Sequence, residues 1–78
     1  MNTRASYYMT IRLRDEDSQR EEEYFLVPAQ EENWTERKIS MYHPVGKAIF
    51  SKEVDQVVNV LDAKGQSKRY RILQIEPT

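Results

Sequence analysis

The sequence has no cysteine, one histidine and only two glycines among its 78 residues. The absence of cysteine excludes disulfide bonds, thiolate zinc sites and a thiol nucleophile, and it is typical of proteins from a reducing compartment. The single histidine, His43, excludes a metal site built from several imidazoles. The longest apolar stretch runs only from Tyr24 to Pro28, and residues 1–6 lack the apolar region of a signal peptide. We therefore expect neither a membrane span nor a signal peptide.

The length limits what the chain can enclose. A chain of 78 residues forms one small domain, residues 1–78, and buries about 60% of the surface that its unfolded form exposes. Such a core leaves little room for an enclosed active site, which excludes a large multi-step enzyme. We therefore expect no catalytic residue, no cofactor and no metal site.

An excess of one charge is also missing, since 12 basic and 13 acidic residues nearly cancel to a net charge of −1. No overall field therefore recruits nucleic acid. The charges are unevenly placed: residues 1–39 carry six basic and nine acidic groups, and residues 40–78 carry six basic and four acidic groups. Any partner must be recognised through a local patch.

Hydrophobic periodicity predicts mostly strands. Apolar residues alternate with polar ones from Tyr7 to Arg14, which is the period of a strand with one solvated face. Three further segments rich in branched and aromatic residues also predict strands, at residues 23–27, 54–61 and 68–76. The polar run 15–20 and the segment 62–67 predict the turns of two hairpins. Because residues 54–61 are apolar on both sides, we expect this strand at the centre of the sheet.

One short helix is predicted from Pro44 to Phe50. Proline suits the first helical position, and apolar residues at the i, i+3 and i+4 positions form one face that must dock on the sheet. The preceding stretch, 29–37, is mostly polar and predicts a loop with one helical turn, followed by a short extended piece at 38–42. The sum is an α+β domain with a small antiparallel sheet of four to five strands and one short helix.

Residues 38–52 resemble the C-terminal domain of the bacterial GreA/GreB transcript-cleavage factors. The strongest part is Pro44-Val45-Gly46-Lys47-Ala48-Ile49, which is similar to the start of that family's helix. A Val-rich strand at 54–60 follows, and then the segment 65–75 with its Tyr-Arg-Ile-Leu-Gln-Ile ending. The resemblance covers essentially the whole chain and implies an FKBP-like fold.

The resemblance also implies a regulatory module of transcription elongation in the bacterial cytoplasm. Its implied partner is RNA polymerase, bound at the rim helices of the largest β-type subunit near the secondary channel, with nucleic acid contacted only indirectly. The implied docking residues lie in the loop and the helix start: Tyr42, His43, Pro44, Val45 and Lys47. Lys47 would supply a complementary charge and Pro44 a rigid shape.

Secondary contacts are expected from Trp34 and from the basic residues Lys68, Arg69 and Arg71. Trp34 is either an interface anchor or a lid over the core. The three basic residues either contact phosphate or, as we favour, lie on a solvated edge strand protected by its charges. His43 has no evident catalytic partner in the sequence, so we favour a surface or partner contact for it over catalysis.

The cleavage chemistry of the family is not expected here. In full-length members an N-terminal coiled coil presents acidic side chains to the catalytic magnesium of the polymerase. No heptad pattern occurs in this chain, and the acidic run 15–17 lies in a short turn without the reach of a helical hairpin. We therefore expect docking without stimulated transcript cleavage, and no enzyme activity of the chain itself.

Three positions depart from the family pattern. His43 stands where the family has a serine N-cap, and we expect it to be a weaker cap. Ser51 replaces a glycine after the helix, and Val54-Asp55 replaces Gly-Asp in the next turn. These replacements leave open a different backbone path after the helix.

Two alternative functions stay open. A peptidyl-prolyl isomerase follows only from the FKBP-like fold, and it needs a deep pocket lined by several aromatic side chains. A small nucleic-acid-binding domain would use the basic residues 68–71, but the net charge of −1 argues against it.

Overall fold

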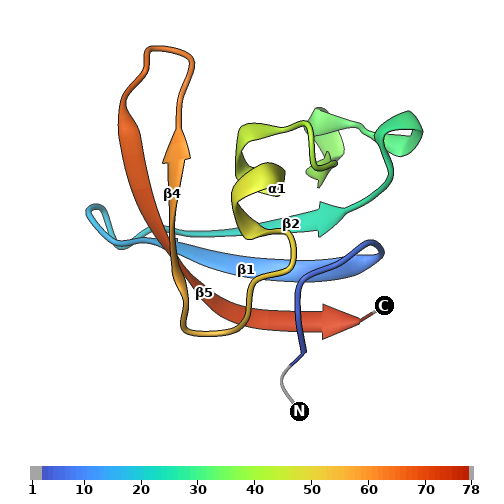
Figure 1. The fold of residues 1–78 in the computed structure, drawn as a ribbon, viewed down its shortest axis with the longest axis horizontal. Coiled ribbons are helices and arrows are strands. Elements are labelled where there is room, and N and C mark those ends of the chain that lie inside the picture. The colour runs from blue at the N-terminus through green and yellow to red at the C-terminus, as the bar shows by residue number, and fades with distance from the viewer. Residues whose placement is uncertain (1–2, 78) are drawn as a thin grey trace.

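Five strands form one sheet in the computed structural model, which describes residues 3–77 (Figure 1). Their bounds are Met9–Asp15 for β1, Glu21–Leu26 for β2, Lys38–Ile39 for β3, Val57–Leu61 for β4 and Ser67–Pro77 for β5. The strand order is β3-β2-β1-β5-β4, and all neighbouring pairs are antiparallel except β2 and β3, which run parallel. The predicted α+β fold is confirmed, with a mixed sheet.

The alternation in β1 places its apolar side chains in the core. Ile11 and Leu13 are fully buried, whereas Arg12 between them is exposed and pairs with Glu23 of β2 at 3.1 Å. β1 pairs with β2 on one side and with β5 on the other. The middle of the sheet therefore joins the beginning of the chain to its last strand.

β5 contains a bulge at Leu73. The ladder with β1 continues from Gln74 directly to Ile72, which leaves Leu73 as the extra residue. Because the side-chain alternation shifts by one here, Ile72 is fully buried and Ile75, three residues later, still packs against the core. The bulge accounts for the spacing of the two isoleucines in the Tyr-Arg-Ile-Leu-Gln-Ile segment.

Two expectations about strand position are wrong. β4 lies at the edge of the sheet and not at its centre, while β5, with its basic residues 68–71, lies between β1 and β4 and is not an edge strand. The burial of β4 alternates, with Val58 and Val60 buried and Val57 and Leu61 exposed. The apolar residues on both sides of β4 therefore belong to an edge strand with one exposed face, and not to a central strand.

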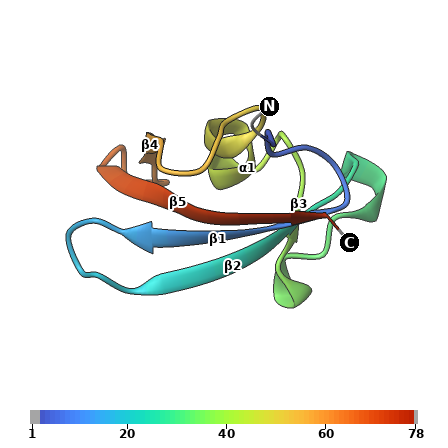
Figure 2. The same cartoon turned by 90° about the horizontal axis from the view of Figure 1, so that it is seen from below.

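One helix, α1 (Pro44–Ile49), lies on one face of the sheet (Figure 2). Its side chains Val45 and Ile49 are buried, as the periodicity predicts. Gly46 is needed because a Cβ at this position would lie 2.0 Å from the carbonyl oxygen of Ser40. The helix therefore packs directly against the loop that precedes it.

No helix within residues 3–77 is long and apolar enough to cross a membrane.

The connections around α1 hold it in place on both sides. The loop between β2 and β3 contains two 3-10 turns, η1 (Ala29–Glu31) and η2 (Trp34–Glu36), where the sequence predicted one helical turn. After the helix, the Ser51 N–H donates to the Ala5 carbonyl at 2.7 Å, and the Ala5 N–H donates to the Lys52 carbonyl at 2.8 Å. The chain before β1 is thereby tied to the end of α1.

Candidate functional site

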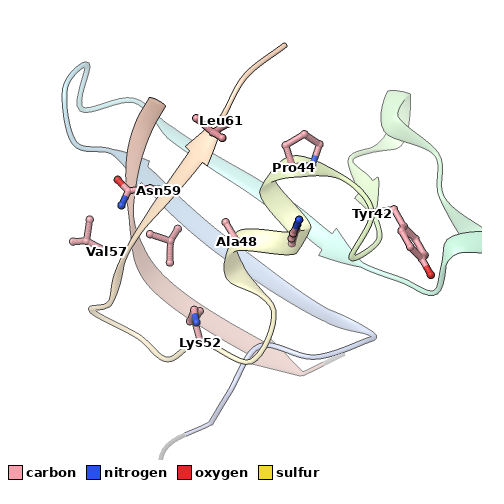
Figure 3. A pocket seen from close by; sticks show the side chains of 9 residues that line it. Tyr42, Pro44, Ala48, Lys52, Val57, Asn59 and Leu61 are labelled. Carbon is pink, nitrogen blue, oxygen red and sulfur yellow. The ribbon is translucent and has the colours of Figure 1, made fainter. Parts of the chain in front are cut away.

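A groove of about 770 Å³ lies between α1 and the edge strand β4 (Figure 3). The helix and its flanking loops contribute one wall, formed by Tyr42, Pro44, Lys47, Ala48 and Lys52. The strand contributes the other wall, formed by Val57, Val58, Asn59 and Leu61. The wall on the helix side therefore contains three of the five docking residues that the sequence resemblance implied.

The loop that presents Tyr42 is fixed by Glu32 and Ser40. The backbone N–H and the Oγ of Ser40, a buried residue, both donate to Oε1 of Glu32, at 2.8 and 2.6 Å. The Ser40 Oγ in turn accepts a hydrogen bond from the Tyr42 N–H at 3.1 Å. The two bonds from Ser40 lower the pKa of Glu32 and keep it ionised. With its backbone fixed in this way, the Tyr42 side chain remains 85% exposed.

His43 caps the helix. Its Nδ1 accepts a hydrogen bond from the Val45 N–H at 3.0 Å, so this nitrogen carries no proton in the folded chain. The imidazole meets Trp34 edge to face, with ring centroids 4.6 Å apart. Burial lowers the pKa of His43, and the Glu32 carboxylate opposes this in part. His43 thus occupies the N-cap position, and its imidazole is held there by ring packing; that it is a weaker cap than serine stays a prediction.

The groove carries positive charge. Lys47 and Lys52 are exposed, and neither forms an ion pair with any other residue of the described range 3–77. None of the residues that line the groove is acidic. The two ammonium groups are therefore available to carboxylates of a partner.

Two of the three basic residues of β5, Arg69 and Arg71, already have acidic partners. The Arg71 guanidinium lies 3.4 Å from the Glu16 carboxylate and donates to the Asp55 carbonyl at 3.0 Å. Arg69 lies 3.9 Å from Asp17. Glu16 and Asp17 belong to the turn between β1 and β2. This turn lies beside β5 because β1 pairs with β5. The acidic turn thus neutralises Arg69 and Arg71, whereas Lys68 forms no ion pair within residues 3–77.

Asp15, at the head of this turn, has a structural role. Its carboxylate accepts hydrogen bonds from the backbone N–H groups of Asp17 and Ser18, at 2.8 and 3.1 Å. The bonds from Ser18 and Asp17 lower the pKa of Asp15. No cluster of three metal-ligating side chains occurs within the part of the chain that the structure describes.

The remaining residues proposed from sequence lie apart from the groove. Trp34 is 61% exposed, so it is not a lid over the core, and it contacts His43 behind the loop. Val45 is only 6% exposed and points into the core. Tyr42, Pro44 and Lys47 are therefore brought together in the groove, while His43 and Val45 position the loop and the helix that carry them.

Comparison with known proteins identifies the domain. The family described as "Transcription elongation factor, GreA/GreB, C-term" matches residues 1–77 of this chain. The chain belongs to this family. The transcription elongation factor GreA of Rhizobium etli (strain CIAT 652) is 38% identical over 65 residues, which cover 83% of this chain and 40% of that protein. The chain thus spans less than half the length of this curated relative.

Solved structures of the GreA/GreB family share the fold. The GreA/GreB elongation factor from Nitrosomonas europaea superposes with a TM-score of 0.78 at 26% identity, covering 97% of this chain and 62% of the other. The GreA factor homolog 1 protein of Thermus thermophilus gives a TM-score of 0.81 at 26% identity, covering 96% and 49%. Both matches agree with the α+β architecture described above.

One of the two replaced glycines of the GreA/GreB pattern corresponds to a left-handed backbone conformation in this chain. Ser51 has a φ of 69° and Asp55 a φ of 75°, both in the left-handed region that glycine adopts without strain. Ser51, which replaces one glycine, thus keeps a glycine-like backbone conformation after α1. Val54, which replaces the other, is not among the residues with positive φ; the left-handed residue there is its neighbour Asp55.

Sequence reasoning missed one wall of the groove. Lys52 and the outward residues of β4, Val57, Asn59 and Leu61, were not singled out as site residues. The sequence did contain a signal for this wall. Val57 and Leu61 are apolar, although the alternate residues of the same strand, Val58 and Val60, are apolar too. We interpreted this pattern as a strand buried on both faces, because the order of strands in a sheet cannot be derived from the periodicity of one strand.

Proposed function

We propose that this chain is a docking module of transcription elongation that binds RNA polymerase at the rim helices of its largest β-type subunit, near the secondary channel. Membership of the GreA/GreB family supports the partner. The groove with Tyr42, Pro44 and Lys47 on one wall is the observation that carries the site. An exposed aromatic ring, a rigid proline and an unpaired lysine provide apolar contact, fixed shape and charge complementarity in one place.

His43 and Val45 take part in this proposal as positioning residues. His43 fixes the first turn of α1 through its cap, and Val45 anchors that turn in the core. Both keep Tyr42 and Lys47 at a constant separation across the loop. Trp34 supports the cap from behind through its contact with His43.

A binding measurement tests the docking. The purified chain is titrated against core RNA polymerase, with Pro44→Ala/Lys47→Glu as the test variant and Lys64→Glu as the matched control. Lys64 is an exposed lysine in the turn between β4 and β5 and does not line the groove. We expect binding by the parent chain and by the control, and at least about tenfold weaker binding by the double variant. Absence of parental binding contradicts the partner, and equal binding by the double variant contradicts the site.

We also propose that the chain does not itself stimulate transcript cleavage and acts as a cytoplasmic regulator rather than an enzyme. Within residues 3–77 the only α-helix has six residues, so no coiled coil reaches away from the sheet. The acidic turn is engaged with its own backbone and with the arginines of β5. A cleavage assay on stalled elongation complexes should show no stimulation; vigorous cleavage would contradict the proposal.

Neither alternative function gains support. Among residues 3–77, Tyr42 is the one aromatic residue that lines the groove, which is a poor match to the aromatic pocket of a prolyl isomerase. Arg69 and Arg71 face carboxylates, which disfavours a phosphate-binding strand.

A further inference from the structure

The edge strand β4 has an open side. Within residues 3–77 it pairs only with β5, in an antiparallel ladder. Hydrogen bonds at both ends of this ladder fix its phase: the Ile72 N–H donates to the Gln56 carbonyl at 3.0 Å, and the Asp62 N–H donates to the Gln66 carbonyl at 2.9 Å. At these even-numbered positions the strand backbone therefore faces β5.

The phase decides which backbone groups of β4 are free. In an antiparallel pair, the residues that bond to the neighbouring strand alternate with residues whose N–H and C=O point away from it. Val58 and Val60 continue the bonded set. The backbone groups of Val57, Asn59 and Leu61 consequently point to the open side. They offer a row of donors and acceptors spaced for another strand.

This edge lacks the usual protection against pairing. Natural sheets protect edge strands with charged residues, proline or a bulge. β4 reads Val-Val-Asn-Val-Leu, with no charge and no proline, and its register with β5 shows no shift from Val57 to Leu61. The irregularity lies just before the strand, where the Asp55 N–H, and not the Gln56 N–H, donates to the Ile72 carbonyl. Val57 and Leu61 are 42% and 64% exposed. By contrast, the outer residues of β2 at the opposite side of the sheet include Glu21, Glu22 and Glu23.

The open edge borders the groove described above. Val57, Asn59 and Leu61 line one wall, and α1 with its flanking loops forms the other (Figure 3). Lys47 and Lys52 stand on the helix wall without an acidic partner among the described residues. A chain lying in the groove would meet backbone hydrogen-bonding groups on one side and two ammonium groups on the other.

We propose that the groove binds an extended acidic peptide segment of a partner protein, which adds to β4 as a sixth strand while its carboxylates pair with Lys47 and Lys52. Strand addition satisfies the outward groups of β4, and the carboxylates supply the missing counter-charge. A second copy of this chain fits less well. Pairing two β4 edges would bring four lysines together without a carboxylate from either strand. The inference goes beyond docking on rim helices, which requires no strand edge.

A synthetic probe tests the proposal directly. The probe is a blocked peptide in which Glu alternates with Val, and the control is the same peptide with Lys in place of Glu. Titration of the isotope-labelled chain, followed by backbone amide NMR shifts and calorimetry, should show binding of the Glu peptide only. The largest shifts are expected at the amides of Val57, Asn59 and Leu61, and the affinity should fall with added salt.

Two sets of variants separate the backbone contribution from the charge contribution. Asn59→Pro removes an outward N–H and leaves the ladder to β5 intact, so the chain should remain folded and bind at least about tenfold more weakly. Asn59→Ala loses the same side chain but keeps the N–H, so it is the matched control and should bind more tightly than Asn59→Pro. Lys47→Gln/Lys52→Gln should weaken binding to a similar extent, whereas Lys64→Gln/Lys68→Gln, on the hairpin away from the groove, should not.

The outcomes are decisive in either direction. Equal binding of the Lys peptide, shifts confined to another surface, or undiminished binding by folded Asn59→Pro overturns the proposal. If Asn59→Pro unfolds, a Glu peptide methylated at alternate backbone nitrogens replaces it, and undiminished binding of that peptide overturns the proposal. A dimer of the chain that the Glu peptide does not dissociate also overturns it. None of these measurements uses polymerase, so failure of the proposed docking leaves them interpretable.

Discussion

The Nδ1 atom of His43 accepts a hydrogen bond from the backbone N–H of Val45 at 3.0 Å and so joins the loop to the first turn of α1. This bond exists only while the imidazole is neutral, because a protonated ring has no acceptor nitrogen. The attachment of the loop to the first turn of α1 therefore depends on the protonation state of one side chain, His43.

The first prediction concerns pH. Burial lowers the pKa of His43 below its ordinary value of 6.5, so the unfolded chain binds this proton more readily than the folded chain. The stability that neutral His43 contributes is complete above pH 6.5 and is lost as the pH falls through the lower folded-state pKa. Urea unfolding at about pH 7.5 and about pH 5.5 should show a lower free energy of unfolding at the acidic value.

His43→Asn provides the control for this effect. Asparagine is a strong N-cap that does not titrate, so the variant should keep the helix and lose part of the pH dependence. Identical pH dependence in the parent and the variant would contradict the role of His43. The Glu32 carboxylate acts in a separate, more acidic pH range. The hydrogen bonds from Ser40 lower the pKa of Glu32, so its contribution to the free energy of unfolding is present above pH 4.5 and is lost as the pH falls through the lower folded-state pKa.

The second prediction concerns the contact of Gly46 with Ser40. Gly46→Ala would place a methyl group 2.0 Å from the Ser40 carbonyl oxygen, so α1 must move away from the loop. We expect a loss of about 1–3 kcal/mol in the free energy of unfolding, although alanine favours helices more than glycine does. Thermal or urea unfolding measures it. Lys47→Ala, on the exposed side of the same helix, should stay within about 0.5 kcal/mol, and equal effects of the two substitutions would disprove the close approach.

The third prediction concerns the backbone after α1. Ser51 has a φ of 69°, a conformation that costs a residue with a Cβ about 1–2 kcal/mol and glycine almost nothing. Ser51→Gly should therefore stabilise the chain by about 0.5–1 kcal/mol after the greater flexibility of the unfolded glycine is subtracted. Ser67→Gly, in β5, should destabilise it instead. Unfolding curves for the two variants that shift in the same direction would rule out this explanation.

The fourth prediction concerns the hydrogen bonds of Ser40. Ser40→Ala removes a donor to the Glu32 carboxylate and the acceptor of the Tyr42 N–H in a buried position. We expect a loss of about 1–3 kcal/mol, together with increased mobility of the loop in NMR relaxation. Glu32→Gln keeps an acceptor oxygen and should cost less. A larger loss for Glu32→Gln than for Ser40→Ala would show that the carboxylate charge, rather than the serine hydroxyl, holds the loop.

The sequence was sufficient for the elements but not for their order. Alternation of apolar residues located β1, and Pro44 with the apolar face behind it located α1, because both signals are local. β4 lies at the edge because β5 pairs with β1 on its other side. β1 is some sixty residues away from β5 in the chain. No periodicity within β4 records that choice.

The site was predicted in the same uneven way. Tyr42, Pro44 and Lys47 lie within one short segment, so the motif that carries the resemblance also located them. The opposite wall comes from a distant strand and could not be assigned without the fold. The pairing of Arg69 and Arg71 with the acidic turn was equally hidden, since it requires β1 and β5 to be neighbours.

The pairing of β1 with β5 also sets the order in which this domain can be made. Met9 lies opposite Pro77 in the sheet, so the central strand pair cannot close until the last strand has left the ribosome. Until then β1 can pair only with β2, and its other edge has no partner strand. The central strand pair therefore rests on contacts between residues far apart in the sequence, and small domains with such contacts fold more slowly than those built from local contacts.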